Sequence, residues 1–75
     1  MPKRTDLSAG KINGSDRLTV ELVELTGKPP IIAITWPPKP TVCTPAQFDQ
    51  VVATAMRLLS AAVVELAALR AHRRL

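Results

Sequence analysis

The residues able to perform acid–base or nucleophilic chemistry are few and scattered. The chain has one histidine, His72, one cysteine, Cys43, and no tyrosine. His72 falls near the end of a predicted helix with no nucleophile close to it in sequence, where histidine usually complements the helix dipole. Glu21 and Glu24 are three residues apart in a predicted strand, so they point to opposite faces and form no acid–base pair. We therefore predict no catalytic residue, and we interpret the chain as non-enzymatic.

The potential ligands for metals and cofactors are also sparse. Cys43 and His72 are too few soft ligands for a zinc site, and a single cysteine excludes an internal disulfide. Gly10, Gly14 and Gly27 are too widely spaced to form a phosphate-binding loop. We predict no metal and no cofactor, and the lone thiol favours a reducing, cytoplasmic location.

Basic residues gather at the two ends of the chain, whose net charge is +4 with an isoelectric point near 10.0. They either complement the helix dipole and keep the ends solvated, or contact the phosphates of a nucleic acid. Because no base-reading motif is present, any nucleic acid would be bound mainly through its backbone. The candidate phosphate contacts are Lys3, Arg4, Lys11, Arg70, Arg73 and Arg74.

The pattern of residues 44–74 predicts one long helix. Thr44 is placed as the N-cap, Pro45 suits the first helical position, and Gln47 stands where a capping box needs Glu or Gln. Apolar residues then recur at alternating steps of four and three, which is the seam of a heptad repeat. The members of this heptad seam are Phe48, Val52, Ala55, Leu59, Ala62, Leu66 and Leu69.

The length of this helix points to oligomerisation. From Pro45 to Arg73 it spans roughly 43 Å, whereas a compact chain of this size is only roughly 30 Å across. The helix packs in part across its own hairpin, and we predict that a second copy covers the rest through the heptad seam. An antiparallel pair centred between Ser60 and Ala61 sets larger side chains against smaller ones and is preferred. A parallel pair remains the alternative.

The chain before the helix divides into three parts. Residues 1–16 have little apolar content and are predicted to form a flexible basic arm. Residues 17–36 alternate apolar and polar side chains around a loop at residues 26–30, which predicts a β-hairpin. The proline-rich residues 37–43 are an extended link to the helix. The predicted fold is α+β: residues 17–75 form one ββα domain, a β-hairpin followed by one long C-terminal helix, which oligomerises through that helix.

The helix also approaches the length and apolarity of a membrane span. Arg57 and Glu65 lie inside it, and each costs roughly 2.5–3.5 kcal/mol at the centre of a bilayer on insertion scales. We therefore predict no membrane span.

Two functions fit these features. The first is a small homo-oligomeric protein-interaction module of the adaptor, accessory or regulatory kind. The alternative is a small basic regulator that binds nucleic acid mainly through its phosphates.

Overall fold

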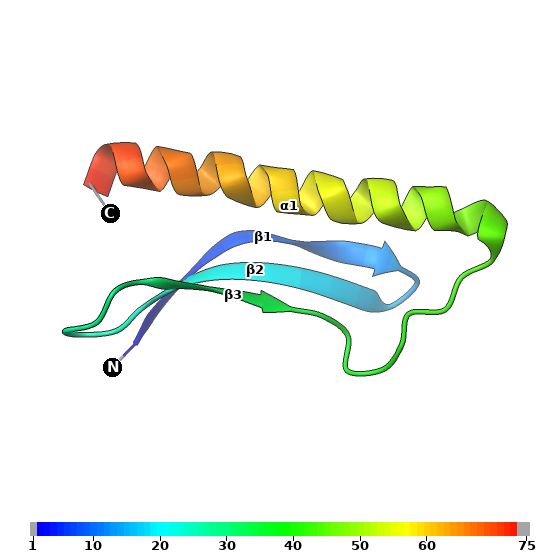
Figure 1. Cartoon of the computed structure of the whole chain (residues 1–75), viewed down its shortest axis with the longest axis horizontal. Helices are drawn as coiled ribbons and strands as arrows, with labels where there is room; N and C mark the ends of the chain where they lie inside the picture. The colour runs from blue at the N-terminus through cyan, green and yellow to red at the C-terminus, as the bar shows by residue number, and fades with distance from the viewer. Residues whose placement is uncertain (1, 74–75) are drawn as a thin grey trace.

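The computed structural model describes residues 2–73, and consists of a three-stranded antiparallel sheet with one long helix along one face (Figure 1). Its elements are β1 (Lys3–Asn13), β2 (Asp16–Glu24), β3 (Ile31–Thr35) and α1 (Pro45–Arg73). The strands lie in the order β1-β2-β3, so β2 is central and the other two strands form the edges. The predicted α+β arrangement, a hairpin followed by one long C-terminal helix, is confirmed, and a third strand is added to it.

The prediction of a flexible arm over residues 1–16 is wrong, because most of that segment is β1. The two large apolar residues of this strand, Leu7 and Ile12, are an odd number of positions apart, so a regular strand would point them to opposite faces. Each lies at a register shift in the pairing with β2, and both are buried. A bulge reverses the alternation beyond it, so the period of two that marks a strand is absent from this sequence.

The predicted hairpin is confirmed as β2 and β3. Val20 pairs with Ile34 and Leu22 pairs with Ile32, so the apolar side chains of the two strands share one face of the sheet. The loop between the strands contains Gly27 with a φ of 74°, a left-handed conformation that glycine adopts without a steric penalty.

The start of α1 carries the predicted capping box. The backbone N–H of Gln47 donates to Thr44 Oγ1 at 3.2 Å, and the N–H of Thr44 donates to Gln47 Oε1 at 3.1 Å. Residues 37–43, which precede the cap, are neither helix nor strand, as expected of the proline link. Asn13 Nδ2 donates to the carbonyl oxygen of Val42 at 2.7 Å, which ties this link to the turn between β1 and β2.

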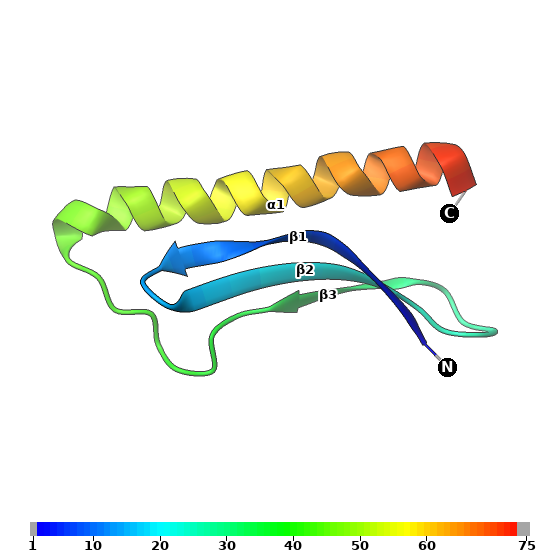
Figure 2. The ribbon, with the colours of Figure 1, turned by 180° about the vertical axis from the view of Figure 1, so that it is seen from behind.

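The helix lies over one edge of the sheet and not over its middle. It packs mainly against β1, less against β2, and makes no close approach to β3; both views show it running the length of the sheet (Figures 1 and 2). One close approach is at Gly10, where an added Cβ would lie 2.9 Å from Leu58 Cδ2. Glycine at this position therefore allows the helix to sit directly on β1.

The core between helix and sheet is small. Ala62 of α1 is buried against the strands, and Leu59, Leu66 and Leu69 pack partly buried around it. The molecule measures 45 × 24 × 14 Å with a radius of gyration of 14.3 Å, whereas about 11 Å is typical of a compact chain of this length. The protein is therefore a thin, elongated two-layer structure. Its buried apolar residues are Leu7, Ile12, Leu18, Val20, Leu22, Val23 and Ala62.

Substitution of Gly10 tests the close packing of α1 on β1. Gly10→Leu places a large side chain where Leu58 already lies, and we expect the free energy of unfolding to fall by about 1–3 kcal/mol. Ala9→Leu is the matched control, because Ala9 is exposed on the opposite face of the same strand. Urea unfolding of both variants measures the difference, and an equal loss of stability in the two would contradict this packing.

Candidate interaction surface

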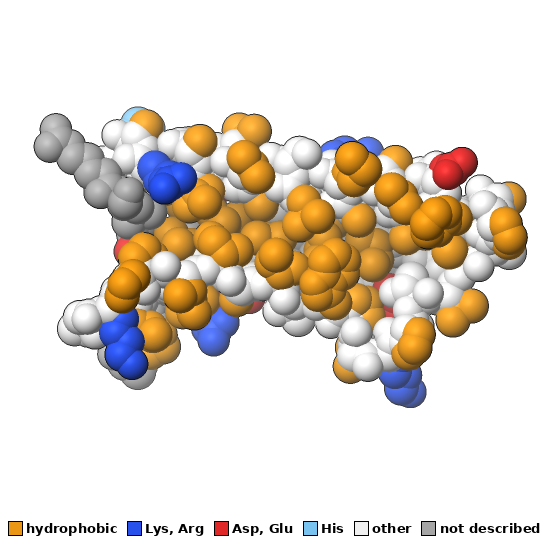
Figure 3. Space-filling view, viewed as in Figure 1, with side chains coloured by type: hydrophobic (Ala, Val, Ile, Leu, Met, Phe, Trp, Pro, Cys, Tyr) orange, Lys and Arg blue, Asp and Glu red, His pale blue; other side chains and the backbone are white. Residues whose placement is uncertain are grey.

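Exposed apolar side chains gather on the side of the molecule where α1 leaves β3 uncovered. The space-filling view shows an almost continuous apolar surface that crosses from the helix to the sheet (Figure 3). We call this surface the apolar face, and define it by the partly exposed side chains of Ile32, Ile34, Trp36, Phe48, Val52, Met56 and Val63.

The sheet contributes the first part of the apolar face through β3. Ile32 and Ile34 pair with buried residues of β2 and point to the side of the sheet on which the helix lies. Trp36, two residues beyond Ile34, continues this alternation. Because the helix is offset toward β1, Ile34 keeps 46% of its surface exposed although its neighbour Val20 keeps 3%.

The helix contributes the second part along one flank. Met56 and Val52 precede Val63 by seven and eleven residues, which places each within about 20° of it around the helix axis. Phe48 is one further turn toward the N-terminus, on the same side. Val63 itself is 68% exposed and lines the space between α1 and β3.

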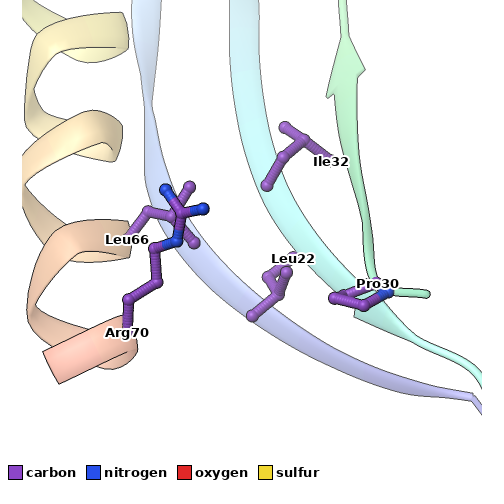
Figure 4. Close-up of a pocket in the computed structure, with 5 residues that line it drawn as sticks. All are labelled: Leu22, Pro30, Ile32, Leu66 and Arg70. Carbon is purple, nitrogen blue, oxygen red and sulfur yellow. The ribbon is translucent and has the colours of Figure 1, made fainter. Parts of the chain in front are cut away.

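A groove runs between α1 and β3, made of two adjoining hollows of about 190 Å³ each that share Ile32 and Leu66. We call it the α1–β3 groove. In one hollow, side chains of α1 and of the β2–β3 region face each other (Figure 4). That hollow is lined by Leu22, Pro30, Ile32, Leu66 and Arg70. The other is lined only by apolar residues: Leu7, Val20, Ile32, Ile34, Leu59, Ala62, Val63 and Leu66.

The heptad seam predicted as an oligomer interface divides into two groups in the structure. Ala62 is buried, Leu59, Leu66 and Leu69 pack against the core, and Ala55 is half-buried. These five residues therefore lie on the side of α1 that its own sheet covers.

Only two members of the heptad seam, Phe48 and Val52, are exposed on the apolar face. Met56 and Val63, which flank the seam in sequence, lie on this face as well. The predicted antiparallel pairing through the whole seam stays a prediction, and the surface left open for a partner is shifted toward β3.

The candidate phosphate contacts are spread over the molecule. Arg4 forms an ion pair with Glu21, its Nη1 lying 3.3 Å from Oε2, and Lys11 pairs in register with Arg17 near the other end of β1. Arg70 lines the end of the α1–β3 groove. The side chain of Arg73 and the whole of Arg74 lie outside the described residues.

Within residues 2–73, no cluster of three histidine, cysteine or carboxylate side chains is placed to hold a metal ion. His72 is exposed at the end of α1, and Cys43 is a half-buried free thiol in the proline link. These two side chains therefore lie near opposite ends of α1 and cannot bind one metal ion together.

By length and composition alone, α1 is long and apolar enough to cross a membrane. Arg57 and Glu65 are both exposed within it. The predicted absence of a membrane span stays a prediction.

Comparison with known proteins identifies no relative of this chain. Neither protein-family models, nor curated proteins, nor solved structures contain a match to the chain. The interpretation of its function therefore depends on the geometry of the apolar face and the charges around it.

Trp36 provides a direct report on the apolar face, because it is the only tryptophan of the chain and is 50% exposed. We expect its fluorescence emission to move to shorter wavelength as protein concentration rises, since covering the face removes the indole ring from water. Acrylamide quenching should weaken in parallel. An emission maximum that stays constant from nanomolar to high micromolar protein would indicate that nothing covers Trp36.

Proposed function

We propose that this chain is a small non-enzymatic protein-interaction module that assembles with copies of itself through the apolar face. The observation that carries the proposal is the mismatch between the core and this face. The face consists of seven large apolar side chains that are on average about half exposed, whereas the described part of the monomer buries six of comparable size. Monomeric proteins rarely leave a contiguous apolar surface of this kind in water.

The size of the apolar face is suited to a stable contact. Two of its seven side chains are aromatic, of a kind that buries roughly 150–250 Å² each, and about half of each is exposed; five aliphatic side chains add to this area. Stable protein–protein interfaces bury about 800 Å² per partner. One further copy therefore suffices to cover most of the face.

The chemistry of the face favours another copy over a polar ligand. One of the two hollows of the α1–β3 groove is lined by apolar side chains only, and the other has Arg70 as its one charged lining residue. Such a surface provides few hydrogen-bonding groups to orient a small polar molecule. A small chain with a marginal core commonly gains the missing burial by oligomerisation.

Val63→Lys tests this proposal at a position where the monomer tolerates the change. Because Val63 is mostly exposed, lysine should leave folding intact but place an unpaired charge within the contact. We expect the dissociation constant of the oligomer to rise by about 10- to 100-fold, as a cost of about 1.4–2.8 kcal/mol implies. Light scattering coupled to size exclusion at micromolar concentration measures this change.

Ala61→Lys is the matched control. Ala61 is exposed and lies two residues away, about 200° around the helix from Val63, so it points away from the α1–β3 groove. Its substitution should leave the oligomer unchanged. A monodisperse monomer for the unmodified chain, or equal effects of the two lysines, contradicts the proposal.

Binding of nucleic acid phosphates is the second candidate function. It is favoured because the chain reverses direction between its elements and so brings several basic residues to one end of the molecule. The start of β1, the β2–β3 loop and the end of α1 lie at the same end of the molecule (Figure 1). They bring Lys3, Lys28 and Arg70 to that end, where counterion release on binding duplex DNA would lower log K by about 0.9 per phosphate for each tenfold rise in salt.

A comparison of two arginines tests this second function. Arg70→Gln should weaken binding to unrelated DNA sequences about equally and reduce the dependence on salt, whereas Arg57→Gln, in the exposed middle of α1, should not. Complete absence of DNA and RNA binding at about 50 mM salt, where the attraction is strong, would eliminate this function and leave the interaction module.

A further inference from the structure

We propose that α1 of a second copy lies in the α1–β3 groove of the first, and reciprocally, so that two parallel helices form a layer between two sheets. This inference rests on the proposed self-association, and it specifies which surfaces meet and in which direction. The product is a three-layer dimer, with sheet, helix pair and sheet in that order.

The width of the groove matches one helix. Neighbouring strands are about 4.8 Å apart, so β3 lies about 9.6 Å from β1, the strand against which α1 mainly packs. Packed helices have interaxial distances of about 8–10 Å. A helix placed over β3 therefore lies at packing distance from α1 without either element moving.

The flank of α1 that enters the contact is apolar from Val52 to Val63, and Arg70 lies on the same flank seven residues further on. In a parallel pair related by a twofold axis, each of Val52, Met56 and Val63 lies near the same residue of the other copy. Arg57 and Glu65 are about 120° and 200° around the helix from Val63, so neither charge lies on the flank where the two helices meet. The parallel pair brings the two Arg70 side chains near each other only at the exposed end of the groove, where solvent screens their repulsion.

The position of the sheets determines the direction of the helices. Two helices packed side by side with antiparallel axes would bring both sheets to the same side of the helix pair, where the two sheets would occupy the same space. A twofold axis parallel to the helices places the sheets on opposite sides. The helices then run in the same direction, and each β3 lies across the helix of the other copy.

The outer side of α1 can accept that second sheet. Ile32 and Ile34 lie level with the segment from Leu59 to Leu66, since these residues line the groove together. On the side of this segment that faces away from its own sheet, the exposed residues are Ser60 and Val64, and Ala67 follows directly after the segment on the same side. They are small or apolar, so the strand of the partner can approach closely.

We assign a second copy to the groove because it covers two uncovered apolar surfaces at once. Each chain has a groove of helix width without a helix, and a helix that is apolar well beyond the side covered by its own sheet. Helices that are apolar all round are normally buried on all sides. A separate partner helix would fill the groove but leave the outer side of α1 in water.

Crosslinking between identical positions tests the arrangement. Single cysteines replace Val52, Val63 or Ala33 in a Cys43→Ser background, and each variant is first checked for its oligomeric state by light scattering. Cysteine behaves as a small apolar residue, so the contact should persist. With a short bismaleimide reagent, we expect covalent dimers for Val52→Cys and Val63→Cys but not for Ala33→Cys, which lies on the outer face of β3.

The other outcomes overturn the inference in distinguishable ways. A dimer that crosslinks at Val63 but not at Val52, which is farther from the middle of α1, has antiparallel helices. A dimer that crosslinks at Ala33 pairs its β3 edges, and one that crosslinks at none of the three uses another surface. In each of these cases self-association stands while the parallel helix layer is wrong. A monomer for every variant and for the unmodified chain overturns both proposals.

Discussion

The close contact between α1 and β1 is the interaction on which the rest of this structure depends. In β1, the residues in register with Leu22, Val20 and Leu18 are Thr5, Ser8 and Gly10. Leu7, at a register shift, adds a large side chain to the same core. The helix sits close to this strand, and at Gly10 an added Cβ would lie 2.9 Å from Leu58 Cδ2, so that side chain would have to shift. On the other edge of the sheet, β3 presents Ile32 and Ile34, and no helix lies above them.

The offset of the helix explains why the monomer is thin and only partly packed. A helix centred over three strands would bury both edges, but a helix over β1 leaves the apolar side chains of β3 and one flank of α1 in water. The core is correspondingly small for a chain in which 47% of residues are hydrophobic. Since burial of apolar surface is the main source of stability, a chain built in this way gains by being covered.

The chain has few side chains suited to acid–base or nucleophilic chemistry, which is consistent with a function in assembly. The side chains that could do acid–base or nucleophilic work are scattered over separate elements, and the groove contains apolar walls with a single arginine at one end. A surface of this kind distinguishes partners by shape and by exclusion of water. We therefore base the proposed function on the apolar face and not on any individual polar residue.

The sequence by itself determined the elements whose signals are local. The capping box of Thr44 and Gln47 and the alternation of apolar residues in β2 predicted α1 and the β2–β3 hairpin, because capping, helical spacing and strand alternation depend on neighbouring residues. β1 was missed because its two register shifts interrupt the alternation that identifies a strand. The heptad spacing indicated that Leu59, Ala62 and Leu66 would be covered. Only the tertiary structure decided that their own sheet covers them, because spacing along a helix identifies an apolar side but not the surface that packs against it.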